Sequence, residues 1–308
     1  MSFKTTVVQA YFIQAFFEYA LVYIFFIVIC VMSFKNLVFG TAGIPISTPD
    51  HNTINGIKHV HDLKLSGMEL EFVHGVTVSS EKAPLVKKVS LENDVLLTCH
   101  GSYYINLNST ADKTSDSIGR VLSCARRAEE AGAFSMTFHA GFYLADSPQT
   151  TFANIKKQFE SITKELAHSS NKITIRPETT GKATQFGSIE ELLLLCSQLD
   201  NVLPCIDFSH LHARSNGKVN SYEEFRAVLE QSEKALGKEF LKNLHCHVSG
   251  IEYTNKGERK HLVLAESDFK YKELLRALKD MGCAGLVICE SPNIEEDALL
   301  LKKTFENL

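Results

Sequence analysis

The sequence predicts an α/β fold, a single (β/α)8 (TIM) barrel spanning residues 32–308, on three observations. Short β-rich segments alternate there with longer segments of helical period, in eight consecutive pairs. The β-rich segments lack strict polar–apolar alternation, which is typical of parallel strands buried on both faces. Eight βα units in this length match the size of one barrel. A doubly wound open sheet is the alternative, but no Gly-x-Gly-x-x-Gly motif follows the first strand.

The predicted strands are the segments richest in Val, Ile, Leu and Phe. In chain order they are residues 37–40, 68–73, 95–100, 134–139, 173–178, 202–207, 244–247 and 286–290. Three of the intervening helices have recognisable ends. One begins at Ser115 and stops at Gly132, a second starts at the capping box of residues 188–191, and a third opens at Ser267 and runs to Met281. No repeat or linker divides this region, so we expect one domain.

Residues 1–31 do not belong to the barrel pattern. The stretch from 11 to 32 is almost wholly apolar and would span ~33 Å as a helix, enough to cross a bilayer. A membrane or signal-anchor helix is one interpretation, although Glu18 lies near its middle. The other is an upstream extension from an early start codon, because residues 32–35 repeat residues 1–4. Both remain open, and a membrane partner is expected only under the first.

Composition limits the functions that the chain can have. It has 32 Lys and Arg against 36 Asp and Glu, a net charge of −4, so binding of nucleic acid through bulk positive charge is excluded. A content of 44% hydrophobic and 22% charged residues excludes disordered and collagen-like chains. The eight cysteines form no Cys-x-x-Cys pair. We expect them to be buried thiols in a reducing, cytoplasmic compartment.

Acids and imidazoles stand at or just after the ends of six predicted strands. They are His100, His139, Glu178, Asp207 followed by His210, His247 and Glu290. In a barrel these strand ends converge on the C-terminal rim, where active sites lie. Burying so many such groups together is costly unless cations hold them. Seven ligands exceed the needs of one tetrahedral zinc, so the sequence predicts two or three ions, with Zn²⁺ favoured and Mn²⁺ or Fe²⁺ possible at some positions.

The same segments resemble a known family. Residues 100–107 resemble the H-x-S-Y-x-I-N-L signature of the endonuclease IV family of apurinic/apyrimidinic endonucleases, and residues 138–141 resemble its F-H-P-G. Residues 178–181 are similar to its E-N/T-x-G, residues 206–210 to I-D-x-x-H, and residues 290–292 to E-x-P. The matches follow the family's order from about Lys35 to the C-terminus.

This resemblance implies a zinc-dependent hydrolase of base-excision repair. The family cleaves double-stranded DNA on the 5′ side of an abasic site with a metal-activated hydroxide, leaving a 3′-hydroxyl and a 5′-deoxyribose phosphate. Catalytic Glu178 would bridge a first zinc, on His100 and His139, to a second, and the remaining ligands would be Asp207, His247 and Glu290. His210 would help to hold a third. Tyr103 and Tyr104 would wedge into the DNA, and the chain would act as a monomer.

The sequence departs from the family pattern after the seventh predicted strand. The family has Asp-x-His there, whereas this chain has Glu258-x-x-His261, with Lys260 where the family's His would fall. Glu258 and His261 could bind the third zinc through a different loop path, which is the interpretation that we prefer. Lys260 could instead contact a DNA phosphate directly. The centre could also hold only two ions.

Two other functions fit part of the pattern. A sugar isomerase or epimerase of the xylose-isomerase-like barrels would need only one ion, and Glu178, Asp207, His247 and Glu290 would supply its ligands. The additional histidines at residues 100, 139 and 210 argue against it. A non-catalytic, membrane-tethered binding barrel would leave the whole ligand set unexplained. His245, two residues before His247, is expected one layer deeper in a core or supporting role.

Overall fold

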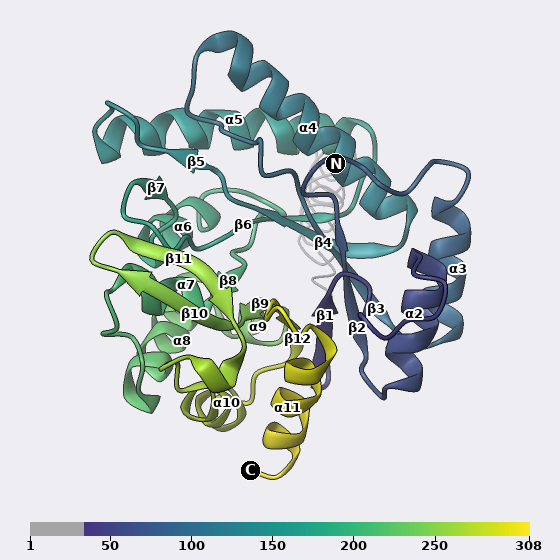
Figure 1. The fold of residues 1–308 in the computed structure, drawn as a ribbon. Coiled ribbons are helices and arrows are strands. Elements are labelled where there is room, and N and C mark those ends of the chain that lie inside the picture. Colours follow the sequence, from purple (N-terminus) through teal and green to yellow (C-terminus); the bar gives the residue numbers. More distant parts are fainter. Residues whose placement is uncertain (1–33) are drawn as a thin grey trace, which may run out of the picture. The chain divides into compact units, whose positions relative to one another are not determined.

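The computed structural model describes residues 34–308, and the apolar segment of residues 1–31 lies outside them. Phe34–Leu308 form one compact unit, a TIM-barrel-like α/β fold built on a curled, parallel eight-stranded sheet (Figure 1). Its strand order is β6-β4-β3-β2-β1-β12-β9-β8. The strands are β1 (Leu37–Ala42), β2 (Gly67–Glu71), β3 (Leu96–His100), β4 (Ala133–Phe138), β6 (Thr174–Pro177), β8 (Ile206–Asp207), β9 (Leu244–Val248) and β12 (Gly285–Cys289).

The two outer strands of this sheet, β6 and β8, are brought together by the residues that precede β8. Isolated parallel bridges join Ile175 to Val202 and Glu178 to Cys205. The Cys205 N–H donates to the Pro177 carbonyl at 3.0 Å, and the Thr179 N–H donates to the Cys205 carbonyl at 3.1 Å. The carboxyl ends of β6 and β8 therefore lie next to each other.

Helices follow most of the strands and cover the outside of the sheet (Figure 1). They are α2 (Thr53–Asp62), α3 (Ala83–Glu92), α4 (Ala111–Glu130), α5 (Pro148–His168), α6 (Ile189–Cys196), α7 (Phe208–Arg214), α8 (Tyr222–Leu236), α9 (Lys238–Leu241), α10 (Tyr271–Asp280), α11 (Glu295–Glu306) and the 3-10 turn η1 (Leu264–Glu266). The capping box predicted ahead of α6 is confirmed, with Ser188 and Glu191 bonded reciprocally.

Two predicted helix starts are wrong. Helix α4 begins at Ala111 and not at Ser115. Helix α10 begins at Tyr271, because Ser267 belongs to a loop: its hydroxyl accepts from the Ile251 N–H at 3.0 Å and donates to the Ile251 carbonyl at 3.2 Å. A Ser-Asp pair before an apolar run therefore served a loop contact here and not a helix cap.

Two antiparallel ribbons were not predicted. Strands β5 (Gly141–Phe142) and β7 (Gln185–Phe186) pair with each other, as do β10 (Gly250–Thr254) and β11 (Gly257–Leu262). The second ribbon directly follows β9, so it extends from the carboxyl end of a barrel strand (Figure 1). Its side chains are therefore placed to reach the rim where the ligand-type residues were predicted.

Apolar side chains fill the space between sheet and helices, and all seven cysteines of residues 34–308 are buried free thiols, as predicted. Within the same residues, no helix combines the length and the apolar character that crossing a bilayer requires.

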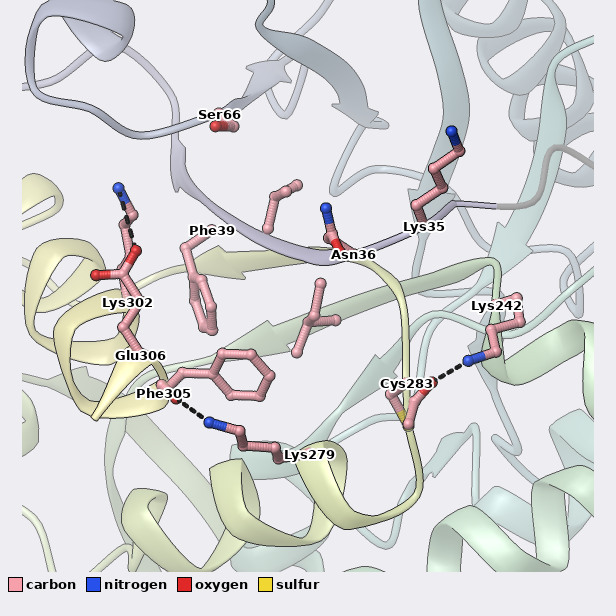
Figure 2. Close-up of a pocket in the computed structure, with 13 residues that line it drawn as sticks. Lys35, Asn36, Phe39, Ser66, Lys242, Lys279, Cys283, Lys302, Phe305 and Glu306 are labelled. Carbon is pink, nitrogen blue, oxygen red and sulfur yellow. Dashed lines mark hydrogen bonds and ion pairs between the residues drawn. The ribbon is translucent and has the colours of Figure 1, made fainter. Parts of the chain in front are cut away.

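The amino-terminal ends of β1 and β12 border a cavity of about 540 Å³ (Figure 2). Four lysines line it, and three of them donate to carbonyl oxygens. Lys242 donates to Gly282, Lys279 donates to Phe305 at 3.2 Å, and Lys302 donates to Lys64 at 2.5 Å. These cations satisfy the exposed carbonyls of chain turns and helix ends at this side of the sheet.

The close approach of β1 and β2 depends on glycine. Gly40 and Gly67 are paired across the two strands, and a Cβ on Gly40 would lie 2.3 Å from the Gly67 carbonyl oxygen. We expect Gly40→Ala to lower the free energy of unfolding by about 1–3 kcal/mol, because the strands must separate. Gly119→Ala, at an exposed position in α4 with open space, should raise it by about 1 kcal/mol. Denaturant titration measures both, and equal effects would contradict this explanation.

Candidate metal centre

Parallel strands carry the predicted ligands to one rim of the sheet. His100 ends β3, His139 follows β4, Glu178 follows β6 and Asp207 ends β8. His247 lies near the end of β9, and Glu290 directly follows β12. Because all eight strands point the same way, their carboxyl ends share this rim, and side chains from residues 100 to 290 become neighbours.

A first group is formed by His100, His139 and Glu178, whose ligand atoms lie within 4.8 Å of one another. His100 Nε2 is 3.2 Å from Glu178 Oε2, and His139 Nε2 is 3.3 Å from Glu178 Oε1. The His100 Nδ1–H can donate to the Gly101 carbonyl at 2.8 Å, which leaves Nε2 free for a cation. The His139 side chain is 26% exposed, so this group faces the opening of the site.

A second group shares Glu178 with the first. Its other members are Asp207, His247 and Glu290. His247 Nδ1 lies 3.5 Å from Glu178 Oε1 and 3.3 Å from Glu290 Oε1. Glu178 therefore belongs to both groups and would be a ligand in each.

A third group contains Asp207, His210 and His261. Asp207 also caps α7, because its Oδ1 accepts from the His210 N–H at 2.7 Å, and Oδ2 remains for a cation. The His210 Nδ1–H can donate to the Thr179 carbonyl at 2.9 Å, which leaves Nε2 pointing toward Glu258 Oε2 at 3.5 Å. The three groups form a chain in which Glu178 and Asp207 are shared.

The β10–β11 ribbon shows how Glu-x-x-His can replace Asp-x-His. Tyr253 pairs with Glu258 and Glu252 with Lys260, so Arg259 is an extra, bulged residue. The bulge places both Glu258 and His261 beside His210. Lys260 points away: its side chain is 65% exposed and its ammonium lies 3.6 Å from a Glu252 oxygen.

Buried polar atoms without hydrogen-bond partners mark the places for cations. Among the described residues they include one atom from each of six predicted ligands, namely His139 Nε2, Glu178 Oε1, Asp207 Oδ2, His210 Nε2, His247 Nδ1 and Glu290 Oε2. Leaving such a group unsatisfied costs about 1–3 kcal/mol. Two or three divalent cations would satisfy all of them. The donor set of imidazoles and carboxylates fits Zn²⁺ and related ions.

Burial and mutual attraction oppose each other in the electrostatics of the rim. Burial alone would raise the pKa of Glu178, but the imidazoles of His139, His247 and His100 outweigh it and hold the pKa well below its ordinary value. Burial would lower the pKa of His100, yet Glu178 raises it to about 10. Burial raises the pKa of Glu290 to about 8 against the opposing effect of His247. Without metal, the site therefore retains protons that a cation would displace.

The sequence analysis missed two acids, Glu69 and Glu71, on β2. Glu69 is fully buried, and a buried Glu71 oxygen has no partner. Burial and the nearby Glu69 raise the pKa of Glu71 to about 7. The strand was predicted to run to Val73, whereas it ends at Glu71. The available signal was two acids at alternate positions of an otherwise apolar strand, which places both on the interior face.

Barrel enzymes carry their active sites at the C-terminal rim, where this fold gathers its acids and imidazoles. This chain belongs to the xylose isomerase-like TIM barrel family, whose model matches residues 57–307. Over 273 residues it is 45% identical to an uncharacterized protein of Methanocaldococcus jannaschii, covering 88% of this chain and 98% of that protein. It is 26% identical over 209 residues to the probable endonuclease 4 of Bacillus subtilis, covering 64% and 67%.

Solved structures of the same fold divide between two activities. The chain matches endonuclease IV from Thermus thermophilus with a TM-score of 0.66 at 16% identity, covering 87% of this chain and 100% of that one. It matches a D-tagatose 3-epimerase-like protein with a TM-score of 0.65 at 16% identity, covering 87% and 96%. Proteins with both kinds of name thus share this fold, and the fold does not separate them.

The metal-free protein should lose stability as pH rises. Folding raises the pKa values of Glu290 and His100 above their ordinary values of 4.5 and 6.5, so above those values the folded chain holds protons that the unfolded chain has released. Their stabilisation is complete below the unfolded pKa and is lost as pH rises through the folded pKa. With chelator, the denaturant midpoint should therefore decrease as pH rises from 4.5 to about 10, whereas the midpoint of zinc-loaded protein should decrease less. A rise with chelator would contradict this.

The bulged ribbon can be tested by metal content. His261→Ala should lower the zinc bound per chain by about one ion, because it removes a donor of the third group. Lys260→Ala, one residue away, should leave zinc content unchanged, because that ammonium points away from the group. Metal analysis after gel filtration gives both values. Loss of zinc from the lysine variant, with no loss from the histidine variant, would overturn the assignment.

Proposed function

We propose that the chain is a metal-dependent phosphodiesterase that cleaves DNA on the 5′ side of abasic sites, leaving a 3′-hydroxyl and a 5′-deoxyribose phosphate. One observation carries the proposal: three ligand groups joined through Glu178 and Asp207 offer more donor atoms than a single-ion enzyme needs. The distant similarity to probable endonuclease 4 supports it. Double-stranded DNA with an abasic site would be the partner, and Zn²⁺ the cofactor.

Bound zinc would supply positive charge for the phosphate oxygens and would lower the pKa of a water molecule that attacks phosphorus. His100 and His139 would hold the first ion, with Glu178 as the bridging carboxylate to Asp207, His247 and Glu290. His210, Glu258 and His261 would hold the third. The partial exposure of His139 supports access of a phosphate to the first group.

Exposed aromatic side chains stand next to the first group. Tyr103 and Tyr104 are 60% and 61% exposed on the loop after β3, and the Tyr103 ring lies 5.5 Å from the His100 ring. Such rings could enter the duplex where a base is missing, since little stacking opposes them there. Lys260, exposed on the ribbon, would contact a phosphate outside the metal groups. Because the net charge is −4, DNA contact would be confined to the rim and would weaken as salt rises.

We propose that the protein acts as a monomer in the cytoplasm. A tether to the membrane would follow only if residues 1–31 form a membrane helix.

A sugar isomerase or epimerase is the second candidate. Glu178, Asp207, His247 and Glu290 alone make a complete site for one cation, and the fold also matches a D-tagatose 3-epimerase-like protein. Under this alternative, the first and third groups would have no role in turnover. Substitution of a histidine that belongs only to the first group therefore separates the two functions.

We expect His139→Ala to reduce nicking of an abasic oligonucleotide duplex by about 100-fold or more, since even loss of a residue that supports a metal ligand costs 10–100-fold. The matched control, His168→Ala, changes an exposed histidine at the end of α5 and should nick normally. Zinc-loaded His139→Ala protein that nicks at the normal rate would contradict the proposal. If the wild-type protein and the His139→Ala variant both convert ketohexoses and neither nicks the duplex, the sugar isomerase or epimerase function would be established.

A further inference from the structure

A buried layer of polar side chains lies directly beneath the second metal group. Glu69, His245 and Ser135 form it, from strands β2, β9 and β4. Glu69 Oε2 is 2.9 Å from His245 Nε2, and Glu69 Oε1 is 3.0 Å from His247 Nε2. Ser135 Oγ lies 2.9 Å from His245 Nδ1. These side chains are shut off from solvent, so each must find its partners within the protein.

The positions of the protons follow from this geometry. Each Nε2 faces one Glu69 oxygen at ion-pair distance, and the two Nε2 atoms also lie 3.3 Å from each other. Because a carboxylate only accepts hydrogen bonds, an imidazole that pairs with Glu69 does so with its proton on Nε2. His245 Nδ1 is then the acceptor of the Ser135 hydroxyl. His247 Nδ1 is left with a lone pair, and that atom faces Glu178 and Glu290.

His247 differs from three other imidazoles of the centre. His100, His210 and His261 each have Nδ1 at a backbone carbonyl. His247 is reversed, because Glu69 occupies its Nε2. A backbone carbonyl comes from the fold itself, whereas this carboxylate is supplied by a side chain on another strand.

We propose that Glu69 is a positioning residue for the metal centre. It holds the proton of His247 on Nε2 and the ring in the orientation that lets Nδ1 bind the cation of the second group. His245, itself held by Ser135, keeps the carboxylate in place. The inference rests on the proposed metal site but is independent of the substrate, because it concerns metal binding alone.

A purely structural role explains this layer poorly. The interior layers of barrels are usually filled by branched apolar side chains. A buried ion pair is often no more stabilising than apolar residues of similar volume. A carboxylate bonded to a metal ligand instead orients that ligand and increases its basicity, and its loss typically weakens metal affinity 10–100-fold.

The decisive measurement is zinc affinity of the full chain by competition with a chelator. Glu69→Gln keeps the size of the side chain but replaces one accepting oxygen by an amide that donates. We expect zinc in the second group to bind 10–100-fold more weakly. Glu295→Gln is the control for lost charge, since Glu295 is a buried carboxylate that accepts from the Ile46 and Ser47 N–H groups and belongs to none of the ligand groups. If both variants weaken zinc binding equally, the loss of one negative charge explains the effect, and the proposal is overturned.

Two further readouts separate positioning from other roles. Long-range ¹H–¹⁵N spectra of the zinc-loaded protein should show His247 bound through Nδ1 with its proton on Nε2, and binding through Nε2 would overturn the proposal. Chemical denaturation of metal-free Glu69→Gln identifies a structural role: lower stability with unchanged zinc affinity would also overturn it. Nicking activity plays no part in these measurements, so failure of the proposed function leaves them intact.

The same layer could itself hold a cation, because ligand atoms of Cys205, His245 and His247 lie within 4.8 Å of one another. Loading with Co²⁺ distinguishes this arrangement, since a thiolate ligand gives an intense charge-transfer absorption that imidazoles and carboxylates lack. We expect no such absorption. Its appearance in wild-type protein and its loss in Cys205→Ser would replace the positioning role by an inner metal site.

Discussion

The attraction between the buried carboxylate of Glu178 and the imidazoles around it is the interaction on which the rest of the site depends. A carboxylate at this depth is unfavourable by itself, and burial alone would raise its pKa. It stays ionised because His100, His139 and His247 converge on it from three other strands. The same convergence leaves several donor atoms without partners. The attraction holds the side chains in place, while the unsatisfied atoms lower the stability of the metal-free fold. Together they indicate a site that is preorganised to bind cations.

The barrel and its appended ribbon contribute different parts of this arrangement. Strand ends place the first two groups, and the bridge between Glu178 and Cys205 brings the carboxyl ends of β6 and β8 together. The third group combines Asp207 and His210 with side chains from the β10–β11 ribbon. Ribbons and loops tolerate change better than barrel strands do. The Glu258-x-x-His261 segment falls in this ribbon, where one bulged residue brings both side chains beside His210.

The eight strands of the sheet could be predicted from the sequence, because they follow from local composition. The gathering of the ligand-type side chains could be predicted as well, because parallel strands end at one rim. The sequence was insufficient wherever a long-range partner decided the outcome. Ser267 resembled a helix cap but bonds to Ile251. The positions of Lys260 and His261 depend on a bulge that no local signal reveals. The role of Glu69 could not be predicted from the sequence, because it depends on which side chains face its carboxylate across the barrel.

Glu69 also indicates how the interior of the barrel and the metal centre are connected. His245 and His247 lie two residues apart on β9 and point to the same side, so one stands below the other. Glu69 lies at ion-pair distance from both, so the deeper histidine belongs to the surroundings of the proposed metal ligand. Under the proposed positioning role, a change in the packing around Ser135 or His245 would alter metal affinity without touching a ligand. The metal centre would then extend one layer below its ligands and include residues of strands β2 and β4.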